Sequence, residues 1–218
     1  MKRFYYCALF VALLVCMASC EGSNPLDAPD GPTGVIHNSH KGHEWVDMGL
    51  PSGNKWAIMN IGATDTLDAG LHFAFGSTIS KEELLESGEY EMSFASTLSE
   101  DVLSSIAGTD NDVAHVRWGG NWRMPTREDY EELFMHCYYH YKVINEKGGY
   151  LFKARNGNRL FLPNTGHYIG LEYTPGGVHN GYYWTATRTI ELRFFKSKEI
   201  VLKSGDAFHG MAVRAICN

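Results

Sequence analysis

The chain has 218 residues, of which 44% are hydrophobic and 13% aromatic. A polypeptide of this length and composition can bury a core, which excludes a wholly disordered protein. The formal net charge is −6, and the sequence holds no long run of lysine and arginine. Binding to nucleic acid through charge is therefore not expected, and neither is binding to anionic lipid.

The first 19 residues have the three parts of an export signal. Lys2 and Arg3 form the positive start, and Phe4–Val15 is an apolar stretch too short to span a bilayer. The small residues before Cys20 resemble a bacterial lipobox, which implies cleavage before this cysteine and attachment of lipid to its sulfur. We expect an exported lipoprotein that the membrane holds through Cys20. The alternative is an ordinary secretory signal.

Residues 20–43 are rich in proline, glycine, aspartate and serine at their start, which is typical of a flexible tether. His37, His40 and His43 recur in it every three residues. An extended, glycine-containing segment does not preorganise imidazoles for a metal, so we expect solvated histidines rather than a metal site. The sequence thus predicts a signal peptide over 1–19, a linker over 20–43 and one domain over 44–218.

Only two cysteines, Cys137 and Cys217, remain once the leader is removed and Cys20 carries lipid. In an exported, oxidising setting they are a candidate disulfide, which would close a loop of about 80 residues and contribute roughly 4 kcal/mol. The alternative is two separate buried thiols, because sequence spacing alone does not show that the two residues lie close together.

Short strands and short helices are expected in the first half of the domain. Glycine, proline and other turn-forming residues bound the apolar runs, and acidic helix-forming runs follow. The predicted strands are Trp45-Val46, Lys55–Ile61 and Leu71–Phe75, and the predicted helices are Lys81–Glu89 and Glu100–Ile106. The acidic stretch Gly108–Asp112 lacks the glycine and distal glutamate of a calcium-binding loop, so it is interpreted as a plain acidic turn rather than a calcium site.

The segment WGGNWRMPT, at 118–126, predicts a tight turn followed by the entry to a helix. Gly119 and Gly120 allow Trp118 and Trp122 to approach each other, and Arg123 and Pro125 lead to a capping Thr126. We expect these seven residues to have a structural role. Arg127–Tyr141 then predicts the main amphipathic helix, whose apolar face holds Tyr130, Leu133, Phe134, Cys137, Tyr138 and Tyr141. Its Glu132, His136 and His140 are interpreted as a solvated stripe rather than a metal site.

The C-terminal half predicts closely spaced antiparallel strands. Each is a short aromatic or β-branched run bounded by turn residues. These runs are Tyr150–Ala154, Arg159–Leu162, Tyr182–Thr187, Glu191–Phe195, Glu199–Leu202 and Met211–Ile216. Pro163–Gly181 is glycine-rich and predicts a long ordered loop. One central helix with many short strands indicates an α+β fold.

Five motifs, in order, resemble the Fibrobacter succinogenes major paralogous domain family. They are EWVDMGLPSGNKWAIMNIGA, DVAHVRWGGNWRMPTREDYEEL, NRLFLPNTGHY, GYYWTAT and the closing AVRAI. The resemblance covers about 44–217 and implies an exported lipoprotein of Bacteroidetes-type bacteria with a C-type-lectin-like fold. That fold is related at a distance to formylglycine-generating enzymes, whose RLPTEAEWE motif is similar to RMPTREDYE at 123–131. The fold also commonly joins a helix to the last strand, which favours the Cys137–Cys217 disulfide. Met59 departs from the family, whose members often have cysteine there.

A non-catalytic binding or adhesion module at the outer membrane, with a glycan or an envelope or host protein as its ligand, is the favoured function. Its candidate ligand-binding residues are the late aromatics Tyr168, Tyr173, Tyr182 and Trp184, for which the alternative is plain packing. No cofactor or metal is expected. The second candidate is a structural envelope or fimbria-associated component without a small ligand. An enzyme of the formylglycine-generating type is disfavoured, since the mature chain lacks a pair of neighbouring reactive cysteines.

Overall fold

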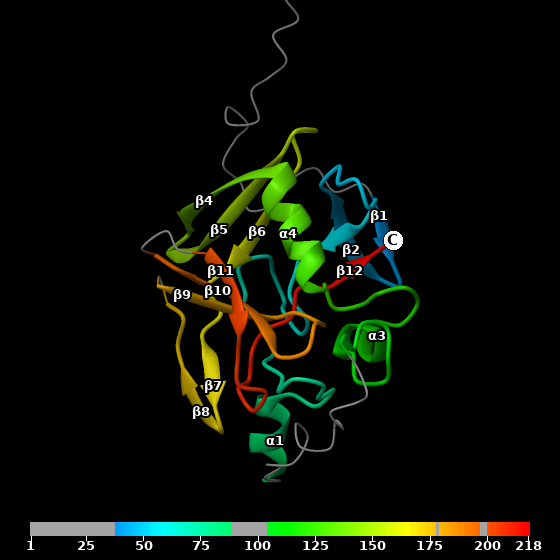
Figure 1. Ribbon diagram of the computed structural model, residues 1–218. Helices are drawn as coiled ribbons and strands as arrows, with labels where there is room; N and C mark the ends of the chain where they lie inside the picture. The colour runs from blue at the N-terminus through cyan, green and yellow to red at the C-terminus, as the bar shows by residue number, and fades with distance from the viewer. Residues whose placement is uncertain (1–37, 89–103, 178, 197–199) are drawn as a thin grey trace, which may run out of the picture.

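The computed structural model describes residues 38–88, 104–177, 179–196 and 200–218 (Figure 1). These residues form mostly antiparallel β-sheet with three short helices, so the α+β class predicted from the sequence is confirmed. None of the helices in the described part of the chain is long and apolar enough to cross a bilayer. The predicted export signal, Cys20 and His37 lie outside the described residues.

The first sheet joins the two ends of the described chain. Its order is β1 (Asn38–His40), β2 (His43–Asp47), β3 (Lys55–Ala57) and β12 (Ile216–Cys217), and Ile216 lies opposite Trp56. The predicted linker over 20–43 is therefore too long. Residues 38–43 are part of the β-hairpin of β1 and β2, which turns at Lys41 and Gly42 with φ of 52° and 81°. These residues therefore belong to the domain.

The second sheet has the order β4 (Cys137–Ile144), β5 (Lys147–Ala154) and β6 (Arg159–Pro163). Helix α4 precedes it and spans only Arg127–His136, so the predicted helix to Tyr141 is wrong in its last five residues. Those residues pair with β5 instead. Aromatic and β-branched side chains favour strand over helix, and the sheet offers the run a partner along its whole length.

The third sheet has the order β11 (Ile200–Ser204), β10 (Ile190–Phe195) and β9 (Asn180–Trp184), close to three predicted strands. The predicted loop over 163–181 contains a further hairpin, β7 (His167–Ile169) with β8 (Glu172–Thr174). Figure 1 shows this hairpin beyond β9, at the end of the molecule that also holds α1.

Two other helices complete the described fold. Helix α1 (Lys81–Ser87) was predicted, and it begins at a capping box in which Ser80 and Glu83 bond each other's backbone amides. Helix α3 (Val113–Trp118) was not predicted, because its six residues are too few to show a helical period. Of the predicted helix over 100–106, only 104–106 are described, and these are not helical. Of the predicted strand over 71–75, only Phe73 makes a bridge.

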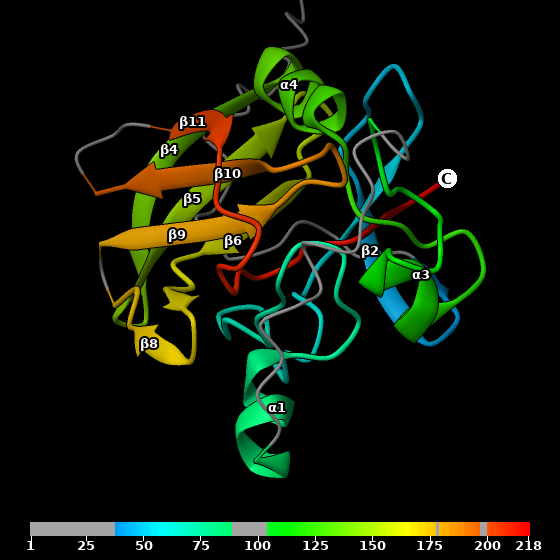
Figure 2. The same cartoon turned by 60° about the horizontal axis from the view of Figure 1, so that its bottom comes forward.

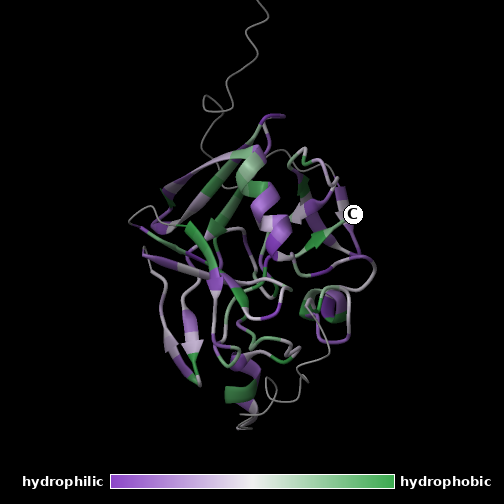
Figure 3. Ribbon diagram, in the orientation of Figure 1, coloured by the Kyte–Doolittle hydropathy of each residue, from purple (hydrophilic) through white to green (hydrophobic). Residues whose placement is uncertain are grey.

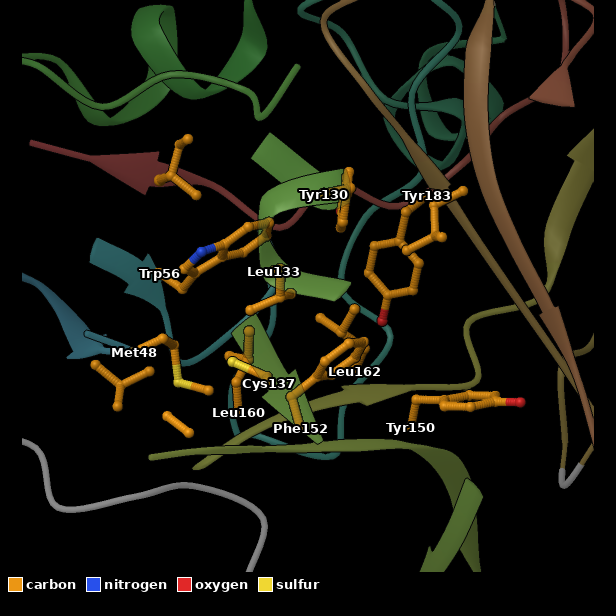
Figure 4. Packing of buried hydrophobic residues seen from close by; sticks show 14 of the residues in the cluster. Met48, Trp56, Tyr130, Leu133, Cys137, Tyr150, Phe152, Leu160, Leu162 and Tyr183 are labelled. Atoms are coloured by element: carbon orange, nitrogen blue, oxygen red, sulfur yellow. The ribbon is translucent and has the colours of Figure 1, made fainter. Parts of the chain in front are cut away.

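The interior consists of two hydrophobic clusters. The first gathers α4 and the sheets around it, with Trp56, Tyr130, Phe152 and Tyr183 among its largest members (Figure 4). Helix α4 packs between sheets, since the Tyr130 ring lies 5.1 Å from that of Trp56 and the Phe134 ring lies 6.0 Å from that of Phe152. The second cluster surrounds Trp122 and Trp184. Figure 3 shows hydrophobic stretches along β5 and β6, and nearly all residues of these two strands are buried.

Candidate functional site

The segment 118–126 holds α3, α4 and the β1–β2 hairpin together. The Trp118 and Trp122 rings meet edge to face at 5.0 Å, and Nε1 of Trp122 donates a hydrogen bond to the His40 carbonyl oxygen. Gly119 has φ 70° and ψ −170°, a conformation closed to other residues. At Gly120, a Cβ would lie only 2.3 Å from Nε2 of His40. The close approach of the hairpin therefore requires glycine at this position.

Asp129 is the carboxylate through which this segment starts helix α4. Its oxygens accept hydrogen bonds from the guanidinium of Arg123, from the amide and hydroxyl of Thr126, and from the side chain of Asn54. Thr126 in turn accepts a hydrogen bond from the Asp129 amide, so it caps the helix as predicted. Pro125 is buried, and its carbonyl oxygen accepts a hydrogen bond from the Ala186 amide.

A half-open pocket of about 460 Å³ lies beside Trp118, between the β2 strand and α3. Its wall combines an indole, a thioether, an imidazole, a guanidinium and a carboxylate with the backbone that follows β3. The lining residues are His43, Glu44, Met59, Asn60, Ile61, Gly62, Ala63, Arg117 and Trp118. Such a mixture of apolar surface and converging polar groups is typical of a small-molecule site.

Two neighbouring rings fix the orientation of Trp118, the aromatic residue of the pocket wall. The His43 ring stacks on Trp118 with 3.9 Å between centroids and 12° between planes. Burial lowers the pKa of His43, so the imidazole is uncharged at neutral pH. Because Trp122 holds the indole edge and His43 covers one face, Trp118 is fixed before any ligand arrives.

Arg117 fixes the cationic side of the same pocket. Its Nε and Nη2 donate to the Thr78 carbonyl oxygen at 3.0 and 2.8 Å, and Nη2 also pairs with the Glu83 carboxylate. Its guanidinium carbon lies 5.0 Å above the Phe73 ring centroid. None of these hydrogen bonds between described residues uses Nη1, whose N–H groups can donate to a ligand with an oxygen acceptor.

Two of the four predicted ligand-binding aromatics do not offer a ring face to a ligand. Trp184 is completely buried, and its Nε1 donates to the Phe73 carbonyl oxygen. Tyr182 is only 7% exposed, with the His167 ring 4.2 Å from its ring and the Arg193 guanidinium 4.9 Å from it. The prediction is wrong for Trp184 and for stacking on Tyr182, since alternate residues of β9 point inward and close packing covers both rings.

The other two predicted aromatics lie together on the β7–β8 hairpin. The rings of Tyr168 and Tyr173 are 4.9 Å apart, and each lies about 5 Å from His72. Tyr168 is 7% exposed, whereas Tyr173 is 44% exposed and donates its hydroxyl to the Thr165 carbonyl oxygen. The structure therefore brings these two residues together, but only Tyr173 presents appreciable surface.

His72 links this hairpin to α1. Its Nδ1 lies 2.7 Å from Oε1 of Glu82, and its Nε2 lies 3.0 Å from the Thr165 carbonyl oxygen. Burial raises the pKa of Glu82, but the hydrogen bonds from the side chain and amide of His72 outweigh it, and the pKa is lowered overall. The pair joins two surface elements and does not open into the pocket at Trp118.

The candidate metal sites of the sequence have other roles in the structure. His40 and His43 pack against the two tryptophans, and Glu132 accepts two hydrogen bonds from Ser52. The oxygens of Asp112 accept hydrogen bonds from the amides of Gly108, Ala114, His115 and Met124, which caps α3. Within the described ranges, no group of three or more potential ligands could hold a metal ion.

The predicted disulfide is not formed. Cys137 and Cys217 are both free and buried, and they belong to different hydrophobic clusters. Cys137 ends α4 and begins β4, whereas Cys217 lies opposite Lys55 in the first sheet. The alternative of two separate buried thiols is therefore the one that the structure adopts.

The pocket at Trp118 was missed from the sequence. The sequence pattern predicts only a structural role for Trp118, and neither Arg117 nor Met59 lies in a motif of a binding site. The one available signal was the juxtaposition of an arginine and a tryptophan before the two glycines, in RWGG at 117–120. The opposite wall comes from residues about 60 positions earlier, and only the folded chain brings them together.

Comparison of the chain with known protein families, with curated proteins and with solved structures gave no match.

Proposed function

We propose that this protein is an exported, lipid-anchored and non-catalytic binding module of the outer membrane, which holds its ligand in the pocket beside Trp118. We further propose that it is a member of the Fibrobacter succinogenes major paralogous domain family, with a C-type-lectin-like arrangement of its α+β fold. The five sequence motifs support the family, and the lipobox before Cys20 supports the anchor.

The pocket is the observation that carries the binding function. A rigid indole beside a guanidinium and a carboxylate suits a ligand with both an apolar face and several hydroxyl groups, as a sugar ring has. Its volume of about 460 Å³ is in the range of pockets for small ligands. A glycan ligand therefore fits this site better than it fits the buried late aromatics.

Filling the pocket tests this function. Met59 lines the pocket and is partly buried, so the substitution Met59→Trp should block the space while the fold persists. We expect the unmodified protein to bind a set of glycans on an array, and the variant to lose at least 90% of that signal. The matched control is Met135→Trp on α4, a position that is 72% exposed. Absence of glycan binding by the unmodified protein, or full binding by Met59→Trp, would contradict the proposal.

The chemistry of the two thiols supports a non-catalytic role. Burial raises the pKa of Cys137 to about 12, with a further contribution from Glu132, and burial raises the pKa of Cys217 to about 11. A cysteine acts as nucleophile or metal ligand through its thiolate, which neither residue forms near neutral pH. This disfavours a formylglycine-generating type of reaction at these cysteines.

A structural component of the envelope is the second candidate, and the surface of β4 favours it. A groove of about 460 Å³ there is lined by Tyr138, Tyr139, His140, Tyr141 and Tyr150. Tyr138, Val143 and Met135 expose 50%, 47% and 72% of their surface nearby in the chain. Exposed aromatic and apolar side chains of this kind are common at contacts between proteins.

A further inference from the structure

A group of basic side chains gathers beside the β7–β8 hairpin, away from the residues of the Trp118 pocket. His167 lies at the start of β7, His209 lies in the turn before Gly210, and Arg193 lies in β10. Figure 2 shows β9 between β10 and the β8 strand of the hairpin. The rings of His167 and His209 are 5.9 Å apart, and Arg193 and His167 contact the Tyr182 ring at 4.9 and 4.2 Å. Side chains from β7, β10 and the turn before Gly210 thus gather around the Tyr182 ring of β9.

The two imidazoles turn one nitrogen inward and one outward. Nδ1 of His167 and Nδ1 of His209 are buried and have no hydrogen-bond partner among the described residues. Neither Nε2 is among the buried unpaired atoms. Because a buried N–H group without an acceptor is rarer than an unpaired buried acceptor, we assign the proton of each neutral ring to Nε2, which makes the outward nitrogen the donor.

The charges around these rings are mostly positive. Arg193 Nη2 pairs with the buried carboxylate of Glu191 at 2.5 Å, and Lys203 lies opposite Glu191 in the sheet. Burial lowers the pKa of His167, and the charges of His209, Arg193 and His72 lower it further. The other acids on the neighbouring elements are Asp206 and Glu172, which are exposed, and Glu82, which pairs with His72. The buried carboxylate of Glu191 thus lies in a group that also contains the basic side chains of His167, His209, Arg193 and Lys203.

We propose that His167, His209 and Arg193 form an anion-binding site that takes an oxyanion, either a carboxylate or a sulfate group, of a ligand. The outward N–H donors would contact the oxyanion, while Arg193, which Tyr182 and Glu191 hold in place, supplies fixed positive charge. Phe208 directly precedes His209, and Ile169 lies on the same face of β7 as His167; the two expose 45% and 54% of their surface and offer apolar contact to the rest of the ligand. The inference is independent of the Trp118 pocket.

Titration with small anions tests the site. The probes are sodium sulfate, glucuronate and, as the uncharged counterpart of glucuronate, glucose, each followed by the NMR signals of the histidine rings in the folded protein. We expect saturable shifts of the His167 and His209 signals with either oxyanion, and none with glucose. A response to sulfate alone or to glucuronate alone identifies the oxyanion that the site takes. Because a bound anion favours the charged imidazole, binding should raise the pKa of His167 and should strengthen as the pH falls from 8 to 6.

Substitution separates a binding role from a packing role. His209→Gln keeps a polar side chain and should weaken the binding of the oxyanion at least fivefold, without a change in the melting temperature of more than a few degrees. The matched control is His136→Gln, an exposed position at the end of α4. Shifts that do not saturate, equal shifts with glucose, or equal affinity in His209→Gln and His136→Gln would overturn the proposal.

Discussion

Single buried polar residues organise much of this fold. Arg214 is completely buried, and its Nε and Nη1 donate to the Asn60 side chain and to the carbonyl oxygens of Ala57 and Ile58. Burial lowers the pKa of Arg214, although the neighbouring Tyr183 and Tyr130 favour its charge. The arginine of the closing AVRAI motif therefore has a structural role, because it holds the backbone after β3 to the last strand region.

The His72–Glu82 pair makes stability depend on pH at the acid end. The pKa of Glu82 is lowered in the folded protein, so the carboxylate stabilises the fold above its unfolded pKa, and this contribution is lost as the pH falls through the folded value. We expect Glu82→Gln to reduce the free energy of unfolding by about 1.5–3 kcal/mol at pH 7, a typical value for a hydrogen bond to a charged group, and by much less at pH 3.

Urea unfolding at the two pH values measures this difference. Glu86→Gln, on the exposed part of the same helix, serves as the control and should change stability little at either pH. A cost of Glu82→Gln that stays constant between pH 7 and pH 3 would show that the carboxylate contributes nothing through its charge.

At the scale of elements, α4 and β4 show where local pattern and tertiary pairing compete. The capping box at Thr126 and the helical face up to Leu133 are local features, and the sequence predicts both. Beyond His136 the spacing of Cys137, Tyr138 and Tyr141 still fits a helix, yet Tyr141 pairs with Tyr150 across a two-residue turn. That turn uses Asn145 and Glu146 with φ of 45° and 65°.

Glu146 is an unfavourable residue for this turn, which gives a test of the β4–β5 hairpin. Its left-handed conformation suits glycine, and Asn-Gly is the preferred pair for a two-residue hairpin turn. We expect Glu146→Gly to raise the free energy of unfolding by about 0.5–1 kcal/mol. Urea unfolding measures this, with Glu172→Gly in β8 as the matched control that should be destabilising. Destabilisation by Glu146→Gly would contradict the observed turn.

The candidate site was less predictable than the elements around it. The roles of Thr126, Pro125 and the two glycines follow from the backbone conformations that these residue types prefer. The sequence alone therefore predicts these roles. The pocket instead depends on Met59 and Arg117 lining the same space, and the burial of Tyr182 and Trp184 depends on what packs over β9. Neither property is a local one, which is why three of the four aromatic residues predicted to bind a ligand are buried here.

At the scale of the whole molecule, the two thiols report on the integrity of the core. Each lies in a different cluster, and burial raises the pKa of both, so neither should react with a thiol reagent in the folded protein. We expect a soluble form beginning at Glu21 to react at two thiols only after unfolding in denaturant, and its melting temperature to be the same with and without a reductant. A lower melting temperature in reductant would instead show a disulfide.

The pairing of β12 with β3 sets a condition on when this protein can fold. Ile216 lies opposite Trp56, and the two residues are 160 positions apart in the sequence. The first sheet therefore cannot be completed while the last residues are still being made or are still crossing a membrane. For a chain exported as proposed, a domain that crosses the membrane unfolded completes its first sheet only after β12 has crossed.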